Sequence, residues 1–155
     1  MAGQGLVAQI VGTCCLIAVF ALFGVGAAEG EVTRRLAQSA PLWLPVVFGL
    51  RGSGLVKWAA LPTLGFWFVL AALAWARSQG VAVPDLNDFT PEGSAVALGV
   101  GAISGLGVVL SLLVRSDAKL LSGLSLLAAV GVLQAGAYLG SMYIQADHHR
   151  MIVVD

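Results

Sequence analysis

Two neighbouring cysteines, Cys14 and Cys15, are the first side chains in this sequence that could do chemistry. Their thiolates would be good ligands for soft metal ions. A disulfide between adjacent cysteines is strained, because the two side chains diverge in a helix. The chain has no CxxC motif and no other cysteine. The sequence therefore predicts neither a disulfide framework nor a zinc site.

The cysteine pair resembles the vicinal cysteines in the first span of small mercuric-ion membrane transporters. The resemblance covers two residues and implies metal transfer at Cys14 and Cys15. Those transporters generally use a second cysteine pair to pass the ion on, and this chain has none. A buried free cysteine otherwise acts as a small hydrophobic side chain, which is the role we expect here.

Two other groups of polar side chains could bind a divalent cation. His148 and His149 follow Asp147, but adjacent helical residues point about 100° apart and rarely reach one ion. The acidic segment 84–93 lacks the glycine and glutamate positions of an EF-hand and is better explained by turns and helix caps. The sequence also has no Ser/His/Asp constellation and no phosphate-binding loop. We therefore expect no metal, no cofactor and no catalytic residue, and hence no enzyme.

The composition is that of a membrane protein. Hydrophobic residue types make up 59% of the 155 residues and charged types only 10%, against about 25% in soluble domains. So few charges cannot cover a globular surface in water, and the excess apolar surface must face the lipid bilayer. The formal net charge of +0 gives no reason to expect a nucleic-acid partner.

Uncharged stretches long enough to cross the bilayer occur four times. A crossing of about 30 Å needs roughly 20 helical residues. The sequence therefore predicts one all-α domain over residues 1–155, with four membrane helices in an antiparallel bundle. The predicted helices cover residues 5–28, 58–76, 93–114 and 120–146.

The apolar stretch 41–50 is too short to cross on this criterion. Ten helical residues reach about 15 Å, and Pro41 and Pro45 weaken a helix there. We expect this segment to lie in the membrane interface with Trp43 at headgroup depth. The alternative is a re-entrant loop enclosed by other spans.

The distribution of basic residues sets the expected orientation. With four spans, loops 29–57 and 115–119 share one side and carry six basic residues, against two on the side of the termini. The positive-inside rule then places both loops in the cytoplasm and both termini outside. The high content of alanine, glycine, leucine and valine suggests a bacterial inner-membrane protein. A cleaved signal peptide over residues 1–28 is a less suitable interpretation, because it has no basic n-region.

Tryptophans and basic residues mark the expected edges of the second span. Trp58 and Trp75 are about 25 Å apart along a helix, a spacing that suits aromatic belts at both interfaces. The expected interfacial anchors are Trp43, Arg51, Lys57, Trp58 and Trp75.

The predicted spans contain no Asp, Glu, Lys, Arg or His. Proton pumps, ion-coupled transporters and haem subunits usually need such groups at membrane depth, so these classes are disfavoured. Gln134 lies near the middle of the last span, and its amide requires a partner inside the bundle. Thr13, Thr63 or Ser104 could supply that partner.

Small residues recur at intervals of four in the last two predicted spans: Ala97, Gly101 and Gly105, then Gly136 and Gly140. This spacing lets helix backbones approach closely in lipid. It is consistent with packing inside the bundle, and also with docking on a second copy or on a partner's helix.

These observations favour a function by association rather than by catalysis. We expect an accessory, assembly or scaffold subunit of a membrane complex, or a homo-oligomer, with lipid and a membrane protein as partners. The alternative is a small pore or carrier for an uncharged or small solute, using Ser, Thr and Gln side chains in the bundle.

Overall fold

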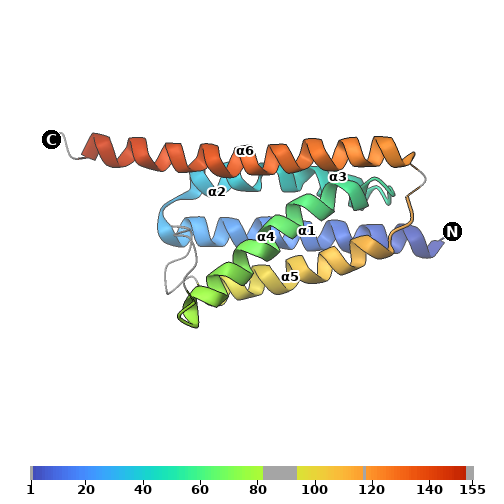
Figure 1. The fold of residues 1–155 in the computed structure, drawn as a ribbon, viewed down its shortest axis with the longest axis horizontal. Helices are drawn as coiled ribbons and strands as arrows, with labels where there is room; N and C mark the ends of the chain where they lie inside the picture. Colours follow the sequence, from blue (N-terminus) through green and yellow to red (C-terminus); the bar gives the residue numbers. More distant parts are fainter. Residues whose placement is uncertain (1, 82–93, 117, 153–155) are drawn as a thin grey trace.

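The computed structural model describes residues 2–81, 94–116 and 118–152, and all regular secondary structure among these residues is helical (Figure 1). The elements are α1 (Ala2–Glu29), α2 (Val32–Ser39), the 3-10 helix η1 (Ala40–Leu42), α3 (Trp43–Leu50), α4 (Val56–Ser78), α5 (Ser94–Leu113) and α6 (Leu120–Ile152). Three of them, α1, α4 and α6, are long and apolar enough to cross a membrane. The expected all-α membrane protein is confirmed at this level.

Between α1 and α4 the chain forms an almost continuous helical run, residues 32–50, made of α2, η1 and α3. Glycines in the left-handed region precede and follow it, Gly30 with φ 71° and Gly52 with φ 65°. At these glycines the N–H of Glu31 bonds to the carbonyl of Gly26 at 2.8 Å, and the N–H of Ser53 bonds to that of Phe48 at 2.9 Å. This six-to-one bond after a left-handed glycine is the Schellman helix end.

The two prolines of this run lie where a missing N–H is tolerated. Pro41 is within the first two positions of η1, and Pro45 is the third residue of α3. The first turn of a helix has no internal partner for its N–H groups. The prolines therefore tighten the run into a 3-10 turn without breaking it.

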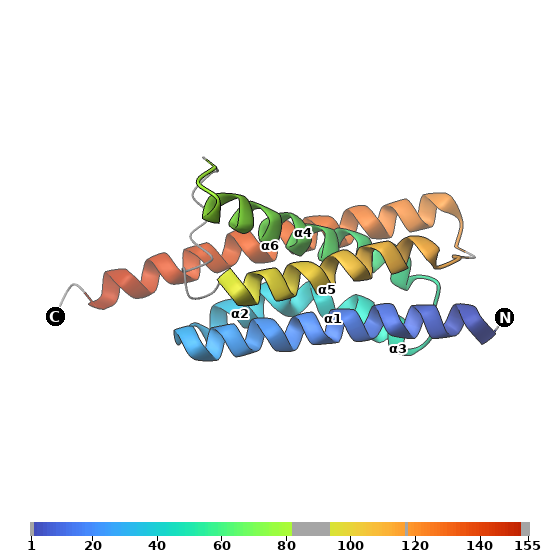
Figure 2. The ribbon, with the colours of Figure 1, turned by 90° about the horizontal axis from the view of Figure 1, so that it is seen from below.

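The run lies antiparallel along α1 (Figures 1 and 2). A Cβ placed on Gly26 would come within 2.8 Å of the Cγ of Arg35, and one on Gly12 within 2.9 Å of the Cα of Gly49. With about 1.5 Å per residue, the run reaches roughly 28 Å. The expected interfacial or re-entrant segment is therefore part of a longer helical run that lies along most of α1.

This additional helical run sets the direction of the helices that follow it. A Cβ on Gly107 of α5 would approach both Leu64 of α4 and Cys14 of α1. Gln4 near the start of α1 bonds to Arg115 after the end of α5, and Gly101 in the first half of α5 faces Ala71 in the second half of α4. Helices α1 and α4 are thus both antiparallel to α5 and parallel to each other.

The expected four-helix antiparallel bundle is therefore not the arrangement observed. In Figure 1 the N-terminus and the C-terminus lie at opposite ends of the molecule, whereas four alternating spans would bring them to the same end. The helix bounds were predicted more accurately than the topology: α1, α4 and α6 contain the predicted helices 5–28, 58–76 and 120–146.

The core lies between α1, α4, α5 and the run 32–50. Its largest fully buried apolar side chains are Trp67, Leu22, Leu42 and Leu64. Helix α6 covers this core against α2, η1 and α4 and adds the buried Tyr138 to it. It continues past the turn where α2 begins (Figure 1). The contact between α2 and α6 brings together most of the buried polar side chains.

Candidate functional site

Two consecutive arginines are buried where α1 turns into α2. Arg34 is 4% exposed and Arg35 is 1% exposed. The Nη1 atom of Arg34 lies 2.8 Å from Oε2 of Glu31, and the Nη2 atom of Arg35 lies 2.8 Å from Oε2 of Glu29. Because a buried arginine needs an opposite charge and hydrogen bonds, the turn that carries both glutamates also stabilises both arginines.

The position of Arg35 depends on a glycine in α1. Its Cβ and Cγ lie against Gly26, where any Cβ would overlap them. The aliphatic part of the arginine fills this groove and its guanidinium reaches Glu29 at the end of the same helix. Helix α1 therefore supplies both the space and the counter-charge for Arg35.

From Arg35 a chain of hydrogen bonds enters the bundle. Arg35 donates to Oε1 of Gln38 at 3.1 Å, and Nε2 of Gln38 donates to Oγ of Ser141 on α6 at 3.0 Å. Nε2 of Gln134, also on α6, donates to the backbone carbonyl of Gln38 at 3.3 Å. We call the residues Glu29, Arg35, Gln38, Ser141 and Gln134 the buried polar chain.

The buried polar chain connects three parts of the fold. It begins at the end of α1, passes through α2 and reaches two positions of α6, Gln134 and Ser141. Gln38, Gln134 and Ser141 are all fully or almost fully buried. In an apolar environment such bonds have few competitors, so the chain fixes the position of α6 against α2.

The chemistry available to this chain is limited. Its one described cation is paired with a carboxylate, and the inner members are amides and a hydroxyl. Among the described residues no three His, Cys, Asp or Glu side chains form a group that could hold a metal ion. The arrangement suits a structural role, holding helices in register, better than proton transfer or catalysis.

Gln134 faces the bundle interior, as its position in the sequence predicts. Its partner is the Gln38 carbonyl, and none of the three side chains expected from the sequence bonds to it. Thr13 is exposed and donates to the carbonyl of Gln9, while Thr63 donates to carbonyls in its own helix. Ser104 is buried, and its hydroxyl has no hydrogen-bond partner among the described residues.

The small residues of the last two helices have different surroundings. Gly101 and Gly105 of α5 lie against Ala71 and Phe68 of α4, where a Cβ would come within 2.6 Å and 3.0 Å of these side chains. Gly136 and Gly140 of α6 are exposed, and a Cβ on either would meet nothing within 4 Å. The side chain of Ala97 lies outside the part that the structure describes.

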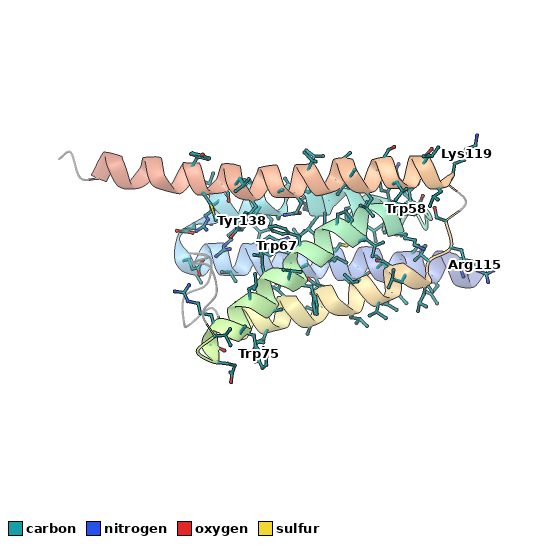
Figure 3. All side chains as sticks on the ribbon, in the orientation of Figure 1. Trp58, Trp67, Trp75, Arg115, Lys119 and Tyr138 are labelled. Carbon is teal, nitrogen blue, oxygen red and sulfur yellow. The ribbon has the colours of Figure 1, made fainter. Side chains whose placement is uncertain are left out.

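The expected interfacial anchors lie at three different levels along the long axis of the molecule. Arg51, Lys57 and Trp58 lie at the end where α4 begins, and the half-exposed Trp75 lies at the opposite end of α4 (Figure 3). Trp43 lies in the middle of the run 32–50, between the contact of Gly49 with Gly12 and the contact of Arg35 with Gly26. It is therefore near the mid-length of α1.

Sequence reasoning missed Arg34, Arg35 and Gln38, because it treated charged and amide side chains as evidence for a solvated loop. A signal for their pairing was present. Glu31 and Arg34 are three residues apart, a helical spacing that favours an ion pair, and Glu29 lies just before them. The other candidates add no site: Cys14 and Cys15 are buried free thiols, while the side chains of 84–93 and 147–150 lie outside the described residues.

No family model matches the chain, and neither a curated protein nor a solved structure is significantly similar to it. The functional argument therefore depends on the molecule's own geometry.

Proposed function

We propose that this chain is a non-catalytic multi-pass membrane protein that acts by helix–helix association, as an accessory, assembly or scaffold subunit or as a homo-oligomer. The observation that carries the proposal is the free face of α6. Only 17% of the most apolar stretch of α6 is buried within the molecule, against 39% for α4 and 44% for α1. A helix held at its inner face by the buried polar chain presents its outer face to other molecules.

The outer face of α6 has the composition of a helix-docking surface. Gly136 and Gly140 form a GxxxG pair on it, flanked by the exposed side chains of Val132, Leu139 and Tyr143. In lipid, such glycines allow two backbones to approach closely, and van der Waals contact with flanking side chains then stabilises the pair. Gly101 and Gly105 of α5 are already packed against α4, which favours α6 as the docking helix.

The pore or carrier alternative receives less support. A pore would need Gln134 and Ser104 on a wettable axis, whereas both side chains are fully buried. The Nε2 of Gln134 donates to the Gln38 carbonyl, while its buried Oε1 has no hydrogen-bond partner among the described residues. The same residues are better explained as the fixed connection between α6 and α2.

We further propose that residues 32–50 and α5 cross the membrane in addition to α1, α4 and α6, so that the chain has five crossings. The support is the length of the run and its antiparallel packing along α1. Trp43 would then lie at mid-membrane depth, so its proposed role as an interfacial anchor no longer applies. Arg34 and Arg35 would lie near one membrane surface, with their charges neutralised by Glu29 and Glu31.

Five crossings also change the proposed orientation. The N-terminus and the turns that hold Arg51 and Arg115 would share one side, and the turn at Gly30 and the C-terminus the other. Each side would then carry four basic residues, and at the second end Arg34 and Arg35 are paired with Glu31 and Glu29. Because the basic residues of the first end have no such partner among the described residues, we take that end as the cytoplasmic one. The proposal is a plasma-membrane protein, in a bacterium the inner membrane, with its N-terminus inside and its C-terminus outside.

Purification in a mild detergent, with mass spectrometry of the intact complex, tests the association proposal. We expect a homo-oligomer or a co-purifying membrane protein, and we expect Gly136→Leu with Gly140→Leu to release it while the melting temperature of the chain changes little. Gly24→Leu is the matched control, because Gly24 is an equally open glycine on α1. A monomer without partners in the unaltered chain would contradict the proposal.

A further inference from the structure

The basic side chains at two turns on opposite ends of the molecule differ in burial. At the turn between α1 and α2, Arg34 and Arg35 are buried and bonded to Glu31 and Glu29. At the opposite end, the basic side chains of Arg51, Lys57, Arg115 and Lys119 are exposed or half-exposed and have no carboxylate partner among the described residues. We call these four residues the basic end.

Contacts between two turns assemble the basic end. Gly54 lies so close to the Arg115 carbonyl that a Cβ on it would come within 2.8 Å of that oxygen. The indole Nε1 of Trp58 donates to Oγ of Ser116 at 3.0 Å. These contacts hold the segment after α3 against the segment after α5, so basic residues distant in the sequence lie at one end of the bundle.

The aromatic side chain of Trp58 lies within this cluster. Its ring centroid is 5.7 Å from Nζ of Lys57, a cation–π distance. The ring also covers Gly123 of α6, where any Cβ would overlap it. Trp58, Arg115 and Lys119 are seen at the same end in Figure 3. A half-buried tryptophan beside cations is typical of the membrane–water interface, where the ring lies at headgroup depth.

We propose that the basic end binds the headgroup of an anionic phospholipid. The proposal rests on charge complementarity, because four cations with no carboxylate partner among the described residues lie at an end that the proposed crossings place at a membrane surface. Each basic residue near an anionic surface contributes about fivefold in affinity. The site goes beyond the association proposal, since it lies at the end where α6 begins, away from Gly136 and Gly140, and does not depend on a protein partner.

Lipid binding to the purified chain in detergent tests the proposal. Native mass spectrometry would count bound dioleoyl phosphatidylglycerol and dioleoyl phosphatidylcholine at equal concentrations. We expect preferential binding of phosphatidylglycerol, reduced about 25-fold by Arg115→Gln with Lys119→Gln. Both side chains are exposed and their replacement should leave the fold intact, which circular dichroism verifies.

The control is Arg77→Gln, which changes an exposed arginine at the other end of α4. It should change phosphatidylglycerol binding less than twofold. Equal binding of the two lipids, or equal loss in Arg77→Gln and in the double variant, would overturn the proposal. Full competition by millimolar inorganic phosphate would also overturn it, because the site would then bind free phosphate and not a lipid.

Discussion

Gly12 of α1 and Gly49 of α3 face each other with their backbones in contact: a Cβ on Gly12 would lie 2.9 Å from the Cα of Gly49. This contact is what allows residues 32–50 to lie along α1. Two glycines opposite one another, with no side chain between them, bring the helix axes closer than any other pair of residues would permit. The folded position of the whole run depends on this contact.

Replacing either glycine by alanine should therefore lower stability. The atoms in the way are backbone atoms, which cannot move aside cheaply, and overpacking of this kind costs about 1–3 kcal/mol. We expect Gly12→Ala and Gly49→Ala to lower the melting temperature in detergent.

Gly24→Ala is the matched control, because Gly24 lies on the same helix with nothing within 4 Å. It should be neutral or slightly stabilising, since alanine favours the helix by up to about 1 kcal/mol. Equal effects at Gly12 and Gly24 would show that the helices are not in contact there.

The buried polar chain predicts a measurable coupling between α2 and α6. Gln38→Leu and Ser141→Ala each remove one partner of the bond between Nε2 and Oγ. In a double-mutant cycle the two changes should be coupled by about 0.6–1.7 kcal/mol, the range for such bonds between membrane helices. Chemical unfolding in mixed micelles would measure the four free energies.

Ser125 supplies the control for this cycle. It lies on the same helix, is exposed and donates only to a carbonyl of its own helix. Gln38→Leu and Ser125→Ala should show additive effects. Additive effects for Gln38 and Ser141 as well would mean that the buried bond does not connect the helices.

The ion pair between Arg35 and Glu29 predicts that a second substitution partly reverses the destabilisation caused by the first. Glu29→Gln keeps the size of the side chain but removes the counter-charge of a buried arginine, and it should destabilise the chain by about 2 kcal/mol. Adding Arg35→Met should restore part of this loss, because the buried charge is then also removed. Thermal melts of the two variants would measure the difference.

Arg51→Gln is the control for removing a charge from an exposed side chain. It should lower the free energy of unfolding by less than about 0.5 kcal/mol. If Glu29→Gln were equally mild, the arginine would have to be stabilised by groups other than this carboxylate.

The sequence was sufficient to predict the positions of the helices whose apolar stretches carry no charge. Residues 5–28, 58–76 and 120–146 lie within helices of the structure because composition and length alone determine that such stretches are helical in lipid. The inward orientation of Gln134 was also predictable, since a buried amide needs a partner.

The continuous helical run over 32–50 was not predictable by the same criterion. Arg34, Arg35 and Gln38 interrupt its apolar character, and a count of uncharged residues rejects it. Contacts with other parts of the fold stabilise the run. They come from carboxylates of the preceding turn, a hydroxyl of α6 and a glycine surface on α1. The partner of Gln134 is a backbone carbonyl in this run, so it could not be identified before the run was placed.

The most direct test of the five-crossing proposal is cysteine labelling on both sides of the run. In a background with Cys14→Ala and Cys15→Ala, Ala28→Cys reports the turn after α1 and Ser53→Cys reports the turn after α3. An impermeant maleimide should label Ala28→Cys in intact cells and Ser53→Cys only after permeabilisation. Protection of both positions, or labelling of both, would place them on the same side and contradict a crossing between them.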